Sequence, residues 1–292
     1  MEKYIVKYCA LKDIIGCALL SQELEFTGKL TKLILTEFVS KLKAEANSFV
    51  GSDIDKLIDP NNFVFDLEEK SEDIHGGVNI KSNNLDIRFN IKSDVSQGEI
   101  DYELQTTEKN YLPARETYYL MRLGNDAYSR GEEYSSKHFT ISIWLFGTSK
   151  KNKSYMNVYS LKDGQNNVLP YCHIIEIDLT KLETCDNLEL KKYLNFFIEK
   201  DLNDYAQGGD EILQKATIRV VGLNGDERIL REIDAEEKRK FNYALDLEAA
   251  KEDGITIGLE KGEAILKPSL EFTSISSLSF AFFFSRSAIK TQ

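Results

Sequence analysis

The chain has 292 residues, 42% hydrophobic and 29% charged, which is enough apolar material for one large domain or a core domain with an appendage. Its net charge of −11 excludes a protein that coats nucleic acid non-specifically, so a nucleic-acid partner would need a local basic patch or bound metal ions. Four cysteines without a C-x-x-C pair, and three histidines, argue against structural zinc and indicate a reducing, cytoplasmic compartment.

No targeting or membrane segment is expected from the sequence. The first residues lack the apolar core of a signal peptide. No apolar run reaches the roughly 18 residues that a membrane-spanning helix needs. We therefore predict a cytoplasmic protein that does not bind a membrane.

Helical periodicity dominates the N-terminal part of the chain. Apolar residues recur at spacings of three and four within residues 11–46, as at Leu30, Leu33, Ile34, Phe38 and Leu42. A stretch rich in turn-forming residues comes next, with Gly51, Pro60, Gly76 and Gly77. The pattern predicts a helical opening segment and then a long connection.

Two strands with a period of two lie beyond this connection, over residues 83–91 and 99–105. Their apolar residues are Leu85, Ile87, Phe89 and Ile91 in the first strand, and Ile100, Tyr102 and Leu104 in the second. The short polar link predicts a hairpin. If both apolar sets share one core, Ile87 lies opposite Tyr102 and Phe89 opposite Ile100, with residues 92–97 as the loop.

The remaining elements predict an α/β fold. A helix is expected after Pro113, and residues 138–146 are apolar enough for a central buried strand. The helix after Pro113 is expected over residues 112–130. The other expected strands cover 154–161 and 172–179, and the other helices cover 188–203, 209–217 and 229–263. We predict a mixed sheet flanked by helices over residues 1–180, a helical extension over 181–263, and a divergent tail over 264–292.

The polar face of the hairpin carries the candidate chemistry. The predicted register places Asp86 opposite Glu103, with Cβ atoms roughly 5 Å apart. Two carboxylates that close repel unless a cation lies between them, and their hard oxygen atoms suit Mg²⁺ or Mn²⁺. Such an ion can bind a phosphate oxygen and activate water, as phosphodiester hydrolysis requires. Glu99 and Asp101 are rival acids, and two ordinary solvent-exposed carboxylates remain the simpler interpretation.

The helix after the hairpin adds a possible DNA contact. Arg115, Tyr119 and Arg122 fall at i, i+4 and i+7, so they share one helical face. A cationic and aromatic stripe beside a metal site could hold a DNA backbone. The alternative places Tyr118 and Tyr119 partly in the core and leaves the arginines in solvent.

Several segments together resemble a known family. They are NNLDIRFNI and GEIDYELQ, then LPARETYYLMRLGNDAYSRGEEYSSKHFTISIWLF, YSLKDGQNNVLPYCHIIEIDLTKL, NGDER at 224–228, and AAKEDGITIGLEKGE. In this order and spacing, over roughly residues 80–263, they resemble the PD-(D/E)XK nuclease family transposases, or recombination-promoting nucleases. Residues 1–79 match only loosely.

The resemblance implies a restriction-endonuclease-like core and metal-dependent DNA cleavage linked to recombination or mobile elements. Asp86 and Glu103 take the metal-ligand places, for Mg²⁺ or Mn²⁺, and Gln105 takes the place of the motif's lysine. A carboxamide donates hydrogen bonds but supplies no charge, so a catalytically weak or inactive DNA-binding or interaction module is the second interpretation. The family's first-helix acid has three candidates, with Glu25 preferred: Glu23, Glu25 and Glu37.

The C-terminal region carries two further features. Gly254, Gly258 and Gly262 are four residues apart, which on a helix gives one smooth face. We predict a flexible or self-associating charged helix there, and with it a homo-oligomer. After Gly262 the sequence departs from the family, and a diverged or disordered tail, a docking strand or a shifted reading frame would each account for residues 264–292.

Overall fold

The computed structural model describes residues 4–50, 53–67, 87–106, 112–126, 137–149 and 153–287. By its internal contacts the chain divides into two units, residues 1–230 and residues 231–292. The first unit contains a mixed sheet with helices, and the second consists mainly of helix α8. The domain boundaries predicted from the sequence, at residues 180 and 263, stay predictions.

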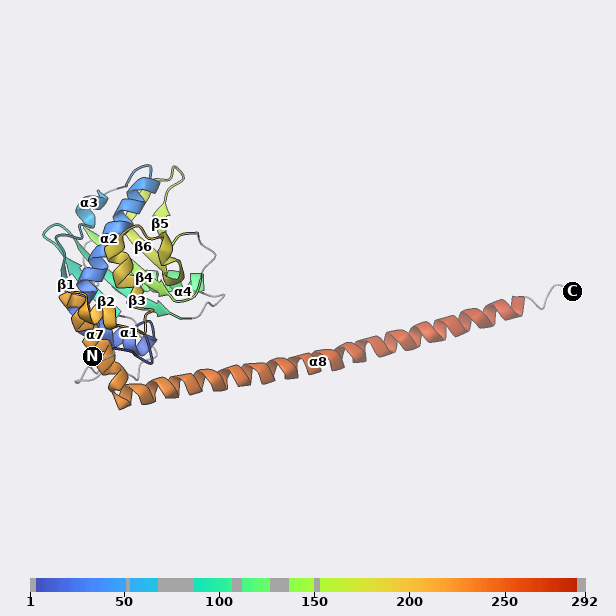
Figure 1. Cartoon of the computed structure of the whole chain (residues 1–292). Coiled ribbons are helices and arrows are strands. Elements are labelled where there is room, and N and C mark those ends of the chain that lie inside the picture. The colour runs from blue at the N-terminus through green and yellow to red at the C-terminus, as the bar shows by residue number, and fades with distance from the viewer. Residues whose placement is uncertain are drawn as a thin grey trace. The chain divides into compact units, whose positions relative to one another are not determined.

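The elements follow one another in a mixed α and β order (Figure 1). The strands are β1 Val64–Leu67, β2 Ile87–Lys92, β3 Gln97–Gln105, β4 His138–Phe146, β5 Met156–Lys162 and β6 Val168–Asp178. The helices are α1 Asp13–Gln22, α2 Leu24–Glu45, α3 Ile54–Leu57, α4 Leu112–Asp126, the 3-10 helix η1 Leu179–Thr184, α5 Leu188–Asn195, α6 Asn203–Gln207, α7 Glu211–Gly225 and α8 Glu227–Ser287.

Six strands of the described chain form one sheet in the order β1-β2-β3-β4-β6-β5. The central pairs β3–β4 and β4–β6 are parallel, whereas the outer pairs are antiparallel. All nine residues of β4 are buried, which fits a strand with neighbours on both edges and helices on both faces. The predicted α/β fold with a mixed sheet and flanking helices is confirmed.

The β2–β3 pairing has the register predicted from the apolar residues. Ile87 pairs with Tyr102, and Phe89 pairs with Ile100. Lys92 also pairs with Gln97, so the connecting loop covers residues 93–96 and is two residues shorter than predicted. Because side chains alternate along a strand, this register fixes which residues of β3 face each side of the sheet.

The two faces of the sheet differ in polarity. One face is apolar and lies against α2, where Thr31 Oγ1 is 2.8 Å from the Tyr102 hydroxyl and the Phe38 ring centroid is 4.9 Å from that of His173. The opposite face carries polar residues of β3 and lies against α4, where the Tyr119 and Trp144 ring centroids are 5.8 Å apart. Helices therefore cover both faces, and the buried carboxylates of β3 lie on the α4 side.

Several short features were not predicted, and three of them lie in the N-terminal part of the chain. The helical segment 11–46 is two helices, separated at Glu23, whose φ of −105° and ψ of 72° are not helical. The turn-rich connection contains the four-residue elements α3 and β1. Elements of four residues are too short to display a period in the sequence, which is why both were missed.

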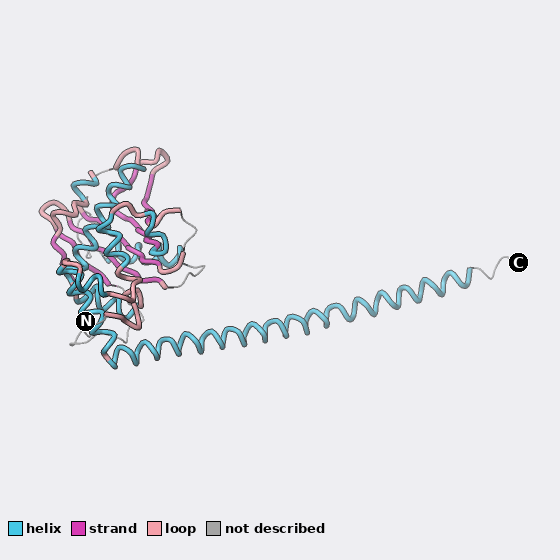
Figure 2. The backbone as a smooth tube through the Cα atoms, viewed as in Figure 1, coloured by secondary structure: helices cyan, strands magenta, loops and turns pink. Residues whose placement is uncertain are grey.

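Helix α8 is continuous from Glu227 to Ser287 (Figure 2). It runs past residue 263, where the sequence predicted that the helix ends. Ion pairs lie along its surface, including Arg239–Glu232 at 3.2 Å and Lys240–Glu236. Across the described residues, no helix is long and apolar enough to cross a membrane.

Candidate active site

The polar face of β3 holds a row of buried polar side chains. Glu99, Asp101, Glu103 and Gln105 alternate with apolar residues, so all four lie on the α4 side of the sheet. Each is less than 9% exposed, and Asp101 is only 2% exposed. Carboxylates are rarely buried to this degree unless a counter-ion or metal compensates the cost. This face is therefore the candidate functional face of the sheet.

Arg115 of α4 is the counter-ion of Glu103. Its Nη2 donates to Glu103 Oε2 at 3.0 Å, and its Nη1 lies 3.4 Å from Gln105 Oε1. The Glu103 side chain is 6% exposed and that of Arg115 is 30% exposed. The Arg115 guanidinium thus contacts both β3 residues that were predicted from the sequence to be catalytic.

Two aromatic rings hold the guanidinium in place. The Arg115 Cζ atom is 5.0 Å from the Tyr119 ring centroid and 5.4 Å from that of Trp144, within range of cation–π attraction. The indole of Trp144 is itself oriented by a 2.8 Å hydrogen bond from Nε1 to Ser142 Oγ. Trp144 also packs with Leu112, Phe146 and Ile174 in a buried cluster. The position of Arg115 is therefore set by packing as well as by charge.

A second buried carboxylate lies on the same face. Trp144 pairs with Glu103 on one side and with Glu176 on the other, so the indole separates two glutamates on alternate strands. Glu176 accepts hydrogen bonds from Asn157 Nδ2 and the Tyr159 hydroxyl, both at 3.2 Å. Burial, reinforced by Glu176 and Glu116, raises the pKa of Tyr159 to about 12, so this phenol stays protonated and able to donate.

The other predicted metal ligand, Asp86, lies outside the described residues. Within the described ranges, no group of three or more His, Cys, Asp or Glu side chains is placed to hold a metal ion. Glu103 contributes the donor chemistry that a hard cation prefers, a carboxylate, and Asp101 lies two residues away on the same face. The residues present therefore fit part of a Mg²⁺ or Mn²⁺ site.

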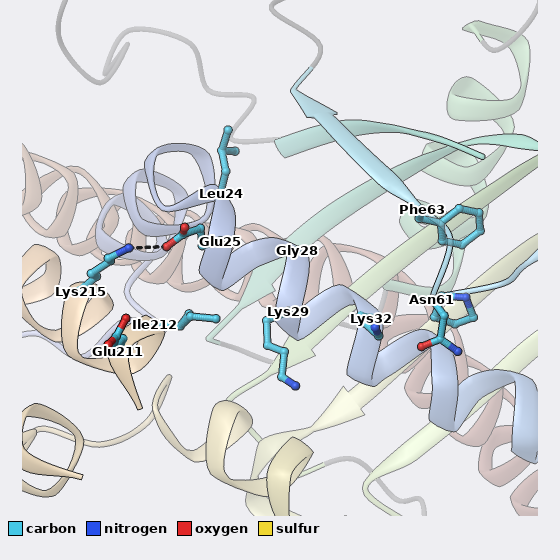
Figure 3. Close-up of a pocket in the computed structure, with 11 residues that line it drawn as sticks. Leu24, Glu25, Gly28, Lys29, Lys32, Asn61, Phe63, Glu211, Ile212 and Lys215 are labelled. Carbon is cyan, nitrogen blue, oxygen red and sulfur yellow. Dashed lines mark hydrogen bonds and ion pairs between the residues drawn. The ribbon is translucent and has the colours of Figure 1, made fainter. Parts of the chain in front are cut away.

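The predicted first-helix acid is located elsewhere. Glu25 lies on α2, the helix that covers the apolar face, and its carboxylate is 2.6 Å from Lys215 Nζ (Figure 3). It lines a groove of about 460 Å³ that also includes Lys29 and Lys32. Of the alternatives, Glu37 lies within α2, and Glu23 is the non-helical residue that precedes it. The structure does not bring Glu25 to Glu103, because Tyr102 and Glu103 point to opposite faces of the sheet.

Helix α1 carries an acid that sequence reasoning missed. The amide of Gly147 donates to the Gln105 carbonyl at 2.9 Å, and a Cβ on Gly147 would meet the Leu11 side chain. Asp13 begins α1 two residues after Leu11, and its Oδ1 is buried. The signal available in the sequence was an acid in the first turn of the opening helix.

The predicted arginine and tyrosine stripe is brought only partly to the site. Arg115 and Tyr119 contact each other, with Nη2 3.3 Å from the Tyr119 hydroxyl. Arg122 is exposed one further turn along α4. Tyr118 is 62% exposed and Tyr119 packs against the core, so the alternative interpretation is right for Tyr119 and for the exposed Arg122, but not for Tyr118.

A mixed sheet covered on both faces by helices, with a Glu-x-Gln strand facing one of them, is consistent with the PD-(D/E)XK fold. Comparison with family models matches residues 66–252, more than half of the chain, to the PD-(D/E)XK nuclease family transposases. The chain belongs to this family, as its sequence predicted. No match was found among curated proteins or among solved structures.

Proposed function

We propose that the protein is a metal-dependent DNA endonuclease that acts in recombination or on mobile elements. The observation that carries this proposal is the convergence of Glu103, Gln105 and Arg115 at one buried end of β3. Membership of a nuclease family makes DNA the expected partner. Free thiols at all four cysteines are in keeping with the cytoplasmic compartment that we propose.

Asp86 and Glu103 are the residues that we propose hold Mg²⁺ or Mn²⁺. The support is the observed pairing of Ile87 with Tyr102, because Ile87 follows Asp86 in the sequence and Tyr102 precedes Glu103. A divalent cation supplies positive charge to a phosphate oxygen and activates water for attack. Asp13 replaces Glu25 as the helix acid that we propose supports this site, because α1 borders the end of β3.

The remaining residues of the site would bind and orient DNA. Gln105 can donate a hydrogen bond to a phosphate or a water but carries no charge. Arg115 can supply the charge that a lysine would otherwise provide, because a guanidinium binds phosphate oxygens through two parallel hydrogen bonds. Tyr119 would position Arg115, and Arg122, which is exposed one turn further along α4, would contact the DNA backbone.

A second function is favoured by the overall charge. A net charge of −11 opposes the approach of DNA, and a glutamine in the lysine position removes one cation from the site. Both would suit a DNA-binding or protein-interaction module that has lost cleavage. Such a module would neither cleave DNA nor bind Mg²⁺ or Mn²⁺ in a calorimeter.

A plasmid-nicking assay separates the two functions. We expect the full chain to convert supercoiled plasmid to the open circle in Mg²⁺ or Mn²⁺, and EDTA to stop the reaction. Asp86→Ala should also stop it, since one of two metal ligands is then missing. A rate that survives EDTA would show that the metal has no part in cleavage, and a rate that survives Asp86→Ala would show the same of Asp86.

We also propose that α8 pairs with a second copy of itself. Its exposed residues Tyr243, Leu247, Ala250, Gly254 and Ile257 are apolar or small and alternate at spacings of four and three, as in a coiled-coil seam. Sedimentation equilibrium should give a dimer that Leu247→Glu converts to monomer. Ile255→Glu makes the same change at an exposed position off this seam and should leave the dimer intact. A monomeric wild-type protein would exclude the pairing.

A further inference from the structure

The guanidinium of Arg115 already pairs with Glu103, the carboxylate that we propose binds a metal ion. Arg115 Nη2 lies 3.0 Å from Glu103 Oε2, and the same guanidinium reaches Gln105 through Nη1. The Glu103 side chain is only 6% exposed, so it needs a positive partner in every state of the protein. In the protein without metal, the guanidinium fulfils that need.

A divalent cation and the guanidinium compete for this partner role. If both contact the same carboxylate, their charges lie only a few ångström apart in a poorly solvated place and repel each other. Arg115 can move away from Glu103 towards solvent, because its side chain is 30% exposed whereas that of Glu103 is buried. It is also not released completely, because it lies over the rings of Tyr119 and Trp144.

We propose that Arg115 is an exchangeable counter-ion of Glu103 that opposes metal binding and is displaced by it. The displaced guanidinium remains on its aromatic support and then faces the phosphate that arrives with DNA. This inference rests on the proposed metal site at Glu103. It means that metal binding and DNA binding strengthen each other, since each favours the same position of Arg115.

A tryptophan beside Glu103 and Arg115 allows this exchange to be followed by luminescence. Trp144 is the single tryptophan of the chain, it pairs with Glu103 on the neighbouring strand, and Arg115 lies over its ring. An indole this close can sensitise the luminescence of Tb³⁺ bound at the Glu103 carboxylate. Tb³⁺ is a hard, oxygen-seeking cation, so it can be used as the probe in place of Mg²⁺ or Mn²⁺.

Titration of the full chain with Tb³⁺, exciting Trp144, tests the proposal. Arg115→Gln removes the competing charge and should lower the half-saturating Tb³⁺ concentration about tenfold, the change expected for loss of one opposing interaction. Arg115→Lys keeps the charge and should remain near wild type, which separates competition from loss of packing. Glu103→Gln should abolish the sensitised emission, and circular dichroism checks that each variant is folded.

Arg228→Gln is the matched control, because Arg228 also pairs with a carboxylate, Asp226, at 3.1 Å but is exposed on the surface. It should leave the Tb³⁺ titration unchanged. If Arg115→Gln binds Tb³⁺ no more tightly than wild type while Glu103→Gln still abolishes emission, the exchange is refuted and the metal site stands. If neither wild type nor Arg115→Gln gives sensitised emission or binds Mn²⁺ in a calorimeter, both proposals are overturned.

Discussion

Glu103→Gln should reduce Mg²⁺-dependent plasmid nicking by at least about 100-fold, because charge stabilisation by a metal ion contributes several kcal/mol to such a reaction. The substitution keeps the shape of the side chain and a hydrogen-bond acceptor for Arg115. It removes the negative charge that a divalent cation requires. The measurement is the initial rate of open-circle formation at saturating Mg²⁺, with EDTA as the zero-rate reference.

The control for this prediction is Asp94→Asn. Asp94 is an exposed carboxylate in the loop between β2 and β3, so Asp94→Asn makes the same charge change nine residues before Glu103, at the other end of β3. Its nicking rate should match that of wild type. A Glu103→Gln protein that is folded by circular dichroism and nicks as fast as the Asp94→Asn control would remove Glu103 from the mechanism.

The stability of the protein should fall as the pH is lowered from about 6.5 to about 4, by about 3 kcal/mol from His173 alone. His173 has no exposed surface, and burial lowers its pKa to about 4, although its Nδ1 lies 2.7 Å from Ser160 Oγ. In this pH range the unfolded chain binds a proton at His173 and the folded chain does not. Protonation therefore favours the unfolded state, and the loss is complete only below the folded pKa.

Urea unfolding at a series of pH values measures this effect. His173→Asn keeps a hydrogen-bonding side chain beside Ser160 but cannot titrate, so its stability should depend less steeply on pH between 6.5 and 4. Carboxylates titrate in both proteins, and the difference between the two curves isolates His173. Parallel curves would mean that this histidine is protonated equally in the folded and unfolded states.

The β2–β3 hairpin was predictable because the residue pattern that determines it lies in two segments that are close in the sequence. A period of two in residues 85–91 and 100–104, together with a short polar link, favours the register that pairs Ile87 with Tyr102, and β2 and β3 have that register. The position of β4 was also predictable, because residues 138–146 are nearly all apolar or β-branched, and all nine are buried in the structure. In each case the pattern of a single segment was enough.

The rest of the candidate site depends on contacts between distant segments. Trp144 and Glu176 join Glu103 only because β4 lies between β3 and β6, an order that no single strand encodes. Glu25 was preferred because it lies on a helix near the N-terminus, but helical periodicity does not reveal which face of the sheet a helix covers. The same lack of long-range information hid Asp13, which begins the helix whose Gly16 lies against Leu104 of β3.

The four-residue turn between β2 and β3 has a consequence for how the protein is assembled. Closing so short a loop costs little chain entropy, whereas β3 and β4 are joined through more than thirty residues of intervening sequence. During synthesis on the ribosome, the hairpin that carries Glu103 and Gln105 can therefore form while β4, which carries Trp144, is still being synthesised. The nascent chain gains the Glu103 carboxylate first, and the packing that holds Arg115 forms afterwards.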